Sequence, residues 1–317
     1  MEQGRIAITH ASESLAQAIL EKLTESGLEP DSVVLLDDES KVGVKLSFGN
    51  SYLAVEDQHE YDYSECSLVL LTQDDEVITQ KLGSQNALVL SHGPGEEGCS
   101  VHAANNSVEL GISYTQQQIQ LVGAELACLL GLLPALQSFS PIAKINTVFL
   151  RTAESKGKQG VDELAGQTVE LLNGRDVTPT TYPLQIAFNM LPAAKIVKFD
   201  DDLPRLLGDN NIDSIHQVID VPVFHGLSAA VQLTFRESVD FEQCEKVLKD
   251  LDNVVIKKTE VSPITDCNQS FSCVITDLDQ PEKQQDTLQF WLIADPLRYG
   301  LASNYVNVVD ILLKSFL

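Results

Sequence analysis

The feature of this sequence that most restricts its fold is a series of short, almost wholly apolar runs within the first hundred residues. The runs are Arg5–Ile8, Ser32–Leu36, Ser67–Leu71 and Ala87–Leu90. Strands that are buried on both faces have this composition, because helices cover both sides of a parallel sheet. After the first run, four apolar residues recur at helical spacing: Leu15, Ile19, Leu20 and Leu23. This alternation predicts a doubly wound parallel sheet with right-handed crossovers.

Local signals give expected ends for the helices of this first part. Ser12 lies where a helix N-cap would be, and the pair Ser26-Gly27 is a typical helix end. Further along, the apolar spacing predicts a long helix over about Thr115–Leu136, with a break near Pro134.

From Lys144 the pattern changes to longer alternating or β-rich runs, which predict a mixed or antiparallel sheet and an α+β second domain. The expected strands are Ile145–Leu150, Ser214–Val223, Ala229–Phe235, Val254–Lys258, Phe271–Thr276 and Thr287–Ala294. The expected helices are Val161–Leu172, Glu242–Leu251 and Ala302–Leu317, and the expected loops are Pro204–Asp213 and Leu278–Asp286.

The charge balance excludes some classes of partner. Lys and Arg total 21 against 46 Asp and Glu, for a formal net charge of -25. Such a surface repels phosphate backbones and anionic lipids, so we expect no nucleic-acid or membrane partner. The N-terminus lacks a signal-peptide layout, and the longest apolar stretch, Leu121–Leu133, is interrupted by Glu125 and too short to span a bilayer.

Cysteine usage indicates a reducing compartment. The six cysteines form no CxxC pair and have no histidine at ligand spacing: Cys66, Cys99, Cys128, Cys244, Cys267 and Cys273. In a chain of 317 residues this pattern predicts reduced thiols, a cytoplasmic location and no metal site.

Four segments carry a resemblance to a known family. Lys158–Gly174 (KQGVDELAGQTVELLNG), Ile186–Pro192 (IAFNMLP), Val221–Ser228 (VPVFHGLS) and Phe290–Gly300 (FWLIADPLRYG) resemble aspartate-semialdehyde dehydrogenases, in that family's order and at about its spacing. The resemblance is closest to a branch of catalytically degenerate bacterial paralogues.

This resemblance implies a Rossmann-like nucleotide-binding domain over residues 1–138, completed by a C-terminal helix at 296–317, and a dimerisation domain over 139–295. It also implies a homodimer. Active members of the family interconvert aspartate semialdehyde and aspartyl phosphate in amino-acid biosynthesis, with NADP, phosphate and a cysteine nucleophile.

The positions that correspond to the family's cofactor site have changed. Thr9, Ser12 and Leu15 replace the glycines that let a backbone approach a pyrophosphate at a helix N-terminus. Asp37 begins a run of three acids that would repel a 2′-phosphate, although one acid there could hold an NAD ribose. Pro296 replaces a cofactor-side asparagine. We therefore expect no cofactor, or NAD or NADP if any binds.

The positions that correspond to the catalytic groups have changed as well. By the resemblance, Ser113 replaces the nucleophilic cysteine and Leu227 replaces the histidine base. Asp220 takes the place of the arginine that clamps the substrate carboxylate, and Arg151 the place of the glutamine that orients the reacting group. His225, two residues before Leu227, would share its face on an extended backbone and could substitute as a base. No intact catalytic set is expected.

These observations favour a catalytically inactive homologue that acts as a dimeric binding or assembly protein, as a homodimer or paired with an active paralogue. The first alternative is a residual NAD(P)-dependent semialdehyde oxidoreductase. The second is a hydrolase that uses Ser113 and His225, because a serine nucleophile needs a base beside it.

Overall fold

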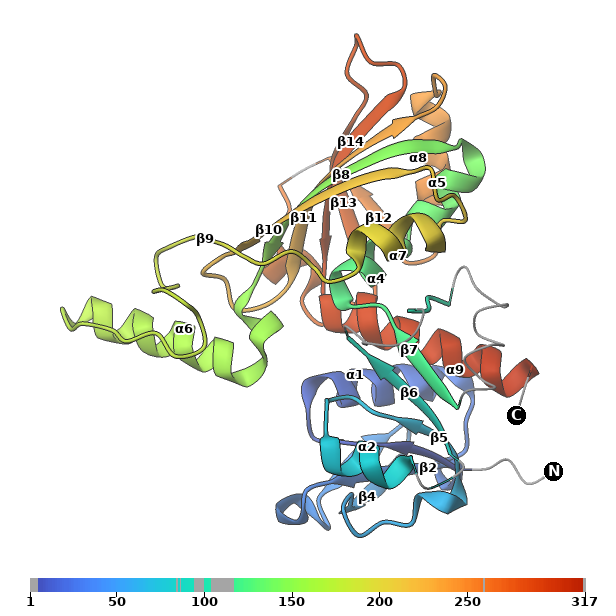
Figure 1. The fold of residues 1–317 in the computed structure, drawn as a ribbon, viewed down its shortest axis with the longest axis vertical. Coiled ribbons are helices and arrows are strands. Elements are labelled where there is room, and N and C mark those ends of the chain that lie inside the picture. The colour runs from blue at the N-terminus through green and yellow to red at the C-terminus, as the bar shows by residue number, and fades with distance from the viewer. Residues whose placement is uncertain are drawn as a thin grey trace. The chain divides into compact units, whose positions relative to one another are not determined.

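The computed structural model describes residues 5–83, 85, 87–93, 100–103, 117–258 and 260–315. The chain divides into two compact units, Met1–Ala127 with Gly300–Leu317, and Cys128–Tyr299. Figure 1 shows the elements of each unit. The unit borders fall within helix α4 (Ala124–Leu130) and within a helical turn at Pro296–Ala302, whereas the expected domain borders lie at 138/139 and 295/296.

The first unit is built on a sheet with the strand order β3-β4-β2-β1-β5-β6-β7. Its strands are β1 Arg5–Ile8, β2 Val33–Asp37, β3 Lys45–Phe48, β4 Ser51–Asp57, β5 Cys66–Leu70, β6 Leu88–His92 and β7 Gln118–Leu121. β3 and β4 form an antiparallel pair, and the other neighbours in this order pair in parallel. The predicted Rossmann-like parallel sheet is confirmed.

Helices cover the middle of this sheet on both faces, which explains why its central strands are mostly apolar. The helices are α1 Ser14–Leu23, α2 Glu76–Leu82 and α9 Ser303–Ser315. Ile78 and Leu82 of α2 share a buried cluster with Ala7 and Val69 of the strands. Ile8, which alternates with Ala7 along β1, is also fully buried, and α1 packs against α9.

The predicted long helix over Thr115–Leu136 is wrong. Its described part forms strand β7, then helix α4, then helix α5 (Leu133–Phe139). Ile119 and Leu121 alternate with more exposed glutamines and pair with β6, so the apolar period here is two. The expected break near Pro134 is present, since α4 ends at Leu130 and α5 begins at Leu133. Pro134 lies in the first turn of α5, where the missing N–H of proline is not needed.

The second unit is built on a mixed sheet with the order β12-β13-β14-β11-β8-β10-β9. Its strands are β8 Ile142–Arg151, β9 Leu191–Pro192, β10 Asp213–Asp220, β11 Leu227–Phe235, β12 Val254–Lys257, β13 Cys273–Asp279 and β14 Thr287–Ala294. β8 pairs in parallel with β10 and β12 with β13, while β11 runs antiparallel to both of its neighbours. The prediction of a mixed sheet is confirmed.

The two faces of this sheet differ in burial. One face is closed by side chains such as Phe149 and Val231, and α7 (Phe199–Leu206) packs on it through an edge-to-face contact of Phe199 with Phe149 at 5.7 Å. The opposite face, which includes Val148 and Trp291, is only partly buried. Helix α8 (Phe241–Lys249) packs against α5 and β12.

The expected loop Pro204–Asp213 is also corrected, since Pro204 lies inside helix α7. This short helix is strongly amphipathic and buries Phe199, Leu203 and Leu206 against the unit. The free energy gained by burying that face outweighs the cost of the backbone hydrogen bond that Pro204 cannot donate. The expected loop treated proline only as a helix breaker and left this burial out.

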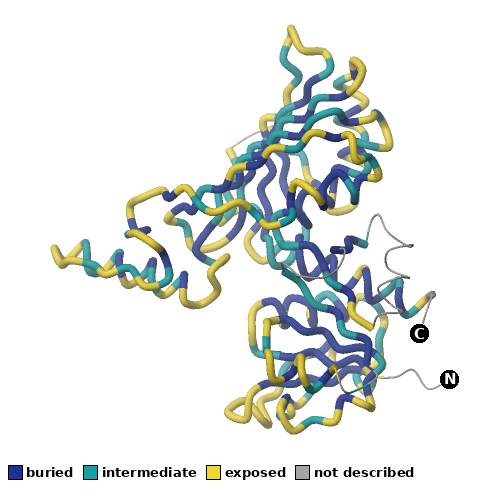
Figure 2. Tube along the Cα trace, in the orientation of Figure 1, coloured by how far each residue is buried: buried dark blue, intermediate teal, exposed yellow. Residues whose placement is uncertain are grey.

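Residues 157–190 form an extension that we call the arm. Helix α6 (Gly157–Leu172) runs out from the sheet, and the following segment returns along it (Figure 1). Gln167 holds the two together, because its side-chain oxygen accepts the N–H groups of Ile186 at 2.9 Å and Ala187 at 3.1 Å. Figure 2 shows exposed residues along much of the length of the arm.

In the parts of the chain that the structure describes, no helix has both the length and the apolar character needed to cross a bilayer.

Two neighbouring residues of α2 provide a direct test of this fold. Ile78 is fully buried against the first sheet, whereas Val77 is 61% exposed on the other side of the helix. We expect Ile78→Ala to lower the free energy of unfolding by about 2–5 kcal/mol through cavity formation. Val77→Ala should change it by less than about 0.5 kcal/mol. Denaturant unfolding of both variants measures the difference, and equal effects would contradict the placement of α2.

Candidate functional site

Three residues predicted to occupy catalytic positions lie in one row across the second sheet. In the strand register, Arg151 of β8 is the partner of Asp220 on β10 and also of Leu227 on β11. Side chains at paired positions of neighbouring strands emerge on the same face and interact. The row lies where the parallel strands β8 and β10 end, and the carboxyl ends of parallel strands are where α/β sheets bind ligands.

Arg151 and Asp220 form an ion pair within this row. The Arg151 Nε donates to the Asp220 Oδ1 at 2.8 Å, and the two side chains are 18% and 7% exposed. The two strand ends are also joined through their backbones, because the N–H of Val221 donates to the carbonyl of Arg151 at 2.9 Å. The guanidinium therefore faces a carboxylate of its own chain, in a setting that strengthens charge-assisted hydrogen bonds.

Leu227 closes the row on the other side of Arg151. Its side chain is 2% exposed, and a leucine neither accepts nor donates a proton. The row thus pairs a charge-neutralised arginine with an apolar residue.

His225 lies outside the strand that carries Leu227. The backbone at Gly226 has a φ of +96°, and a Cβ added there would lie 2.6 Å from the Cβ of Pro263. β11 begins only after this glycine, so the extended backbone expected to place His225 beside Leu227 is not present. The His225 side chain is half exposed, whereas that of Leu227 is buried.

Glu154 is the partner of His225. Its Oε1 lies 3.3 Å from the His225 Nδ1, and its Oε2 accepts the N–H of Gly226 at 3.4 Å. Burial and the charge of Asp295 raise the pKa of Glu154, although its contacts with Gly226 and His225 act to lower it. A carboxylate on Nδ1 can orient a histidine base. Ser113, the nucleophile expected to use that base, lies outside the described residues.

Pro296 begins the helical turn Pro296–Ala302, and Asp295 caps that turn. The Asp295 Oδ1 accepts the N–H groups of Leu297 at 3.0 Å and Arg298 at 2.9 Å. The position expected to contact a cofactor therefore starts a turn whose first donors bind a side chain of the same chain.

In the first unit, Thr9 fills the place expected for the first cofactor glycine. Its Oγ1 donates to the carbonyl of Leu70 at 3.3 Å and accepts the N–H of Thr72. The Thr72 hydroxyl in turn donates to the Thr9 carbonyl at 2.7 Å, and both threonines are buried. These bonds join the segments that follow β1 and β5. They use the carbonyls of Thr9 and Leu70 and the N–H of Thr72 at this edge of the sheet.

Ser12 and Asp37 form the central contact at the same edge. The Asp37 Oδ2 accepts both the backbone N–H of Ser12 at 2.7 Å and its hydroxyl at 2.5 Å. The Asp37 Oδ1 accepts the N–H of Asp38 at 2.8 Å. Burial acts to raise the pKa of Asp37, but these hydrogen bonds outweigh it and lower that pKa below its ordinary value. The carboxylate thus takes the loop donor that an anionic ligand would need.

This contact corrects the expected helix start. The N-cap of α1 is Glu13, whose side chain makes no capping bond, and Ser12 lies one residue before it. Ser12 uses its hydroxyl on Asp37, a long-range partner that the local capping signal does not include. Leu15, at the place expected for the third glycine, is buried in α1.

Gln58 is a site residue that the sequence did not indicate. It is fully buried, and its Oε1 accepts the backbone N–H of His10 at 3.2 Å while its Nε2 donates to Asp38 at 2.8 Å. The Tyr63 hydroxyl donates to the backbone carbonyl of Gln58 at 2.9 Å. A lone glutamine after a strand carries no local signal, so these partners become visible only in three dimensions.

The described residues contain no cluster of three or more His, Cys, Asp or Glu side chains that could bind a metal ion.

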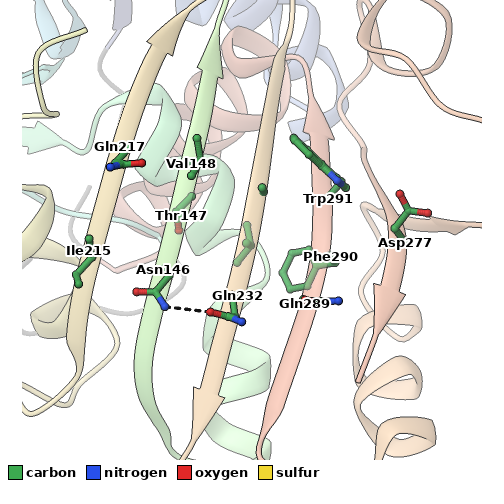
Figure 3. Close-up of a pocket in the computed structure, with 12 residues that line it drawn as sticks. Asn146, Thr147, Val148, Ile215, Gln217, Gln232, Asp277, Gln289, Phe290 and Trp291 are labelled. Atoms are coloured by element: carbon green, nitrogen blue, oxygen red, sulfur yellow. Dashed lines mark hydrogen bonds between the residues drawn. The ribbon is translucent and has the colours of Figure 1, made fainter. Parts of the chain in front are cut away.

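The partly buried face of the second sheet forms a separate groove of about 560 Å³. Figure 3 shows its floor, in which the Asn146 Nδ2 donates to the Gln232 Oε1 at 3.1 Å and Trp291 lies two strands from Asn146. The lining is mostly amide and apolar: Asn146, Thr147, Val148, Ile215, Gln217, Ala230, Val231, Gln232, Asp277, Gln289, Phe290 and Trp291. This composition suits a protein contact better than a small charged ligand.

Asp37 provides a test with a defined pH dependence. Because its pKa is lower in the folded protein than in the unfolded chain, its charge stabilises the fold above pH 4, and this contribution is lost as the pH falls through the folded value. At pH 7 we expect Asp37→Asn to lower the free energy of unfolding by about 1.5–3 kcal/mol. The deficit should shrink below about pH 4.

Glu39→Gln is the matched control, since Glu39 is an exposed acid two residues away. It should change the free energy of unfolding by less than about 0.5 kcal/mol. Urea titrations of both variants across pH provide the measurement. A deficit for Asp37→Asn that stays constant down to pH 2 would contradict the assigned role of its charge.

Comparison with known proteins agrees with this architecture. The family described as "Semialdehyde dehydrogenase, dimerisation domain" matches residues 132–299. Aspartate-semialdehyde dehydrogenase 2 of Vibrio cholerae is 24% identical over 337 residues, which cover 99% of each chain. The enzyme of Rickettsia bellii is 25% identical, with 98% of each chain covered.

Solved structures show the same fold along the whole chain. The crystal structure of aspartate semialdehyde dehydrogenase II from Vibrio cholerae, complexed with ASA, has a TM-score of 0.88 at 23% identity. A probable aspartate-semialdehyde dehydrogenase from Pseudomonas aeruginosa has a TM-score of 0.87 at 24% identity. Both matches cover 100% of each chain. Because the family match spans more than half of its residues, this chain belongs to the semialdehyde dehydrogenase family.

Proposed function

We propose that this protein is a catalytically inactive member of its family, of the aspartate-semialdehyde dehydrogenase type, that acts as a dimeric binding or assembly protein. The observation that carries the proposal is the row of Asp220, Arg151 and Leu227. An anionic substrate needs an arginine that is available to it, and the general base needs a titratable side chain. In this row the arginine is paired internally and the third position is leucine.

The cofactor edge supports the same proposal. The Ser12 amide and hydroxyl donate to Asp37, and Thr9 hydrogen-bonds within the sheet edge. A bound dinucleotide would have to displace the Asp37 carboxylate and would then face its charge at close range. We therefore propose that neither NADP nor NAD is a working cofactor here. The chain would then fall in the degenerate paralogue branch of the family.

A turnover assay tests the proposal. Purified protein is mixed with aspartate semialdehyde, phosphate and either NADP or NAD, and reduced nicotinamide is followed by absorbance. With the expected nucleophile and base both replaced, we expect kcat/KM to be lower by at least about 10⁴-fold than that of the Vibrio cholerae relative run alongside. Turnover within tenfold of that control would establish the alternative, an NAD(P)-dependent oxidoreductase.

Assembly is the second half of the proposal. The groove face of the second sheet is amide-rich and apolar, and the arm exposes large apolar side chains: Val169, Leu172, Leu184, Phe188 and Met190. Exposed apolar side chains in such number often belong to protein interfaces. We propose that a second copy of the chain covers the groove face, in keeping with the dimerisation domain that the family match identifies. Pairing with an active paralogue stays a prediction.

Sedimentation equilibrium tests the dimer. The wild-type protein should sediment at twice the chain mass of 34.7 kDa. Trp291→Glu places a charge in the groove and should weaken the dimer by at least about tenfold. Tyr52→Glu is the control, because Tyr52 is 71% exposed on the first unit. A monomeric wild type, or two variants that dissociate equally, would refute the proposed interface.

We also propose a cytoplasmic location. The described cysteines are buried and take part in no disulfide, which fits a reducing compartment: Cys66, Cys128, Cys244, Cys267 and Cys273.

A further inference from the structure

The groove face of the second sheet carries few charges. Of the twelve residues that line the groove, only Asp277 is ionisable, although the whole chain has a formal net charge of -25. Two copies of such a chain repel each other over most of their surfaces, so a contact between copies is least unfavourable where charges are few. A basic partner would be attracted to the acidic surfaces instead. The charge pattern therefore favours a second copy of this chain as the occupant of the groove face.

A small and a large side chain lie next to each other in the middle of this face. In the strand register, Ala230 of β11 is the partner of Trp291 on β14 and of Val148 on β8. Trp291, seen at the groove in Figure 3, also lines a second hollow of about 570 Å³ beside it, so its side chain forms a ridge between the two hollows. Ala230, with a single methyl group, forms a low point between Val148 and Trp291.

We infer that Trp291 of each copy packs over Ala230 of the other copy, about a two-fold axis that runs between β11 and β14. A two-fold contact needs a self-complementary surface, in which residue i meets residue j and j meets i. A large side chain beside a small one meets this condition, because each copy offers the other a knob and a hole that close-packing can fill. The strand order agrees, since β14 and β11 are the third and fourth of seven strands.

This inference rests on the dimer of the proposed function and deepens it, because it names the part of the second copy that enters the groove. It also restricts the choice of partner. A buried tryptophan is frequently an anchor of an interface, and a bulky residue opposite it would clash. A paralogue with a large side chain at the position of Ala230 would therefore be unable to pair with this chain through the groove face.

The fluorescence of Trp291 reports on this contact directly, because the chain has only one tryptophan. On dilution of the wild-type protein through the dissociation constant of its dimer, the emission maximum should move to longer wavelength, since the indole ring returns to water. The midpoint of this shift should agree with the dissociation constant from sedimentation equilibrium. An emission maximum that stays constant while the dimer dissociates would overturn the inference.

An exchange of side-chain size between the two copies gives the sharper test. Ala230→Trp fills both holes and Trp291→Ala removes both knobs, so each variant alone should have a dissociation constant at least about tenfold above that of wild type. In a mixture of the two variants, every contact again pairs one knob with one hole. Native mass spectrometry of the mixture should then find ~90% or more of the dimers to be mixed.

Two further variants complete the design. Ala230→Leu serves if Ala230→Trp does not fold, with the same preference for mixed dimers expected. Ala54→Trp is the matched control, because Ala54 is an exposed residue of β4 in the first unit, and this variant should dissociate like wild type. Random pairing of the groove variants would overturn the inference and leave the proposed dimer in place, whereas a monomeric wild type would refute both.

Discussion

A charge that leaves water must meet an opposite charge or a set of hydrogen bonds, and this constraint shapes one sheet edge in each unit, at the places where a ligand would otherwise be expected. At the end of β8, the Arg151 guanidinium is held by Asp220. At the end of β2, the Asp37 carboxylate is held by Ser12 and Asp38. In each case the chain supplies both partners, so the buried polar groups are satisfied without a ligand.

If the protein is inactive, as we propose, the same constraint explains how the scaffold would persist without the family's chemistry. A ligand site keeps unsatisfied donors that a substrate completes, and those donors are a cost to the empty protein. Internal carboxylates remove that cost. The strand order, the buried sheet faces and the arm are held by apolar packing that does not depend on the site, as the cluster of Ala153, Leu164, Tyr182, Ile186, Ala187 and Leu191 illustrates. On the proposed function, loss of catalytic groups would therefore leave the fold and the proposed dimer surface intact.

Much of the fold could be predicted from the sequence, because buried parallel strands and amphipathic helices have strong local patterns. β1 and β14 were predicted to the residue, and α6 was predicted apart from its first turn. The hairpin of β3 and β4 was not predicted, since its residues are largely exposed and its apolar pattern is weak. β7 was misread as helix because its alternation covers only four residues beside a helical run.

The site was predictable in its members but not in its contacts. The resemblance identified Arg151 and Asp220 as two separate departures from the family pattern, whereas the strand register shows that they compensate each other. The partner of His225 could not be foreseen either, because Glu154 is far away in sequence and the turn at Gly226 redirects the backbone. Pairings between distant residues follow from tertiary structure, and a single sequence does not record them.

We propose that internal carboxylates have taken the place of the anions of cofactor and substrate. Nicotinamide fluorescence during titration of the purified protein with NADPH, and separately with NADH, measures this most directly at the Asp37 edge. We expect no saturable change in fluorescence up to about 1 mM cofactor, which is the upper end of the usual range of KM values. Saturable binding in the micromolar range would contradict it, because a dinucleotide would then have displaced the contact between Ser12 and Asp37.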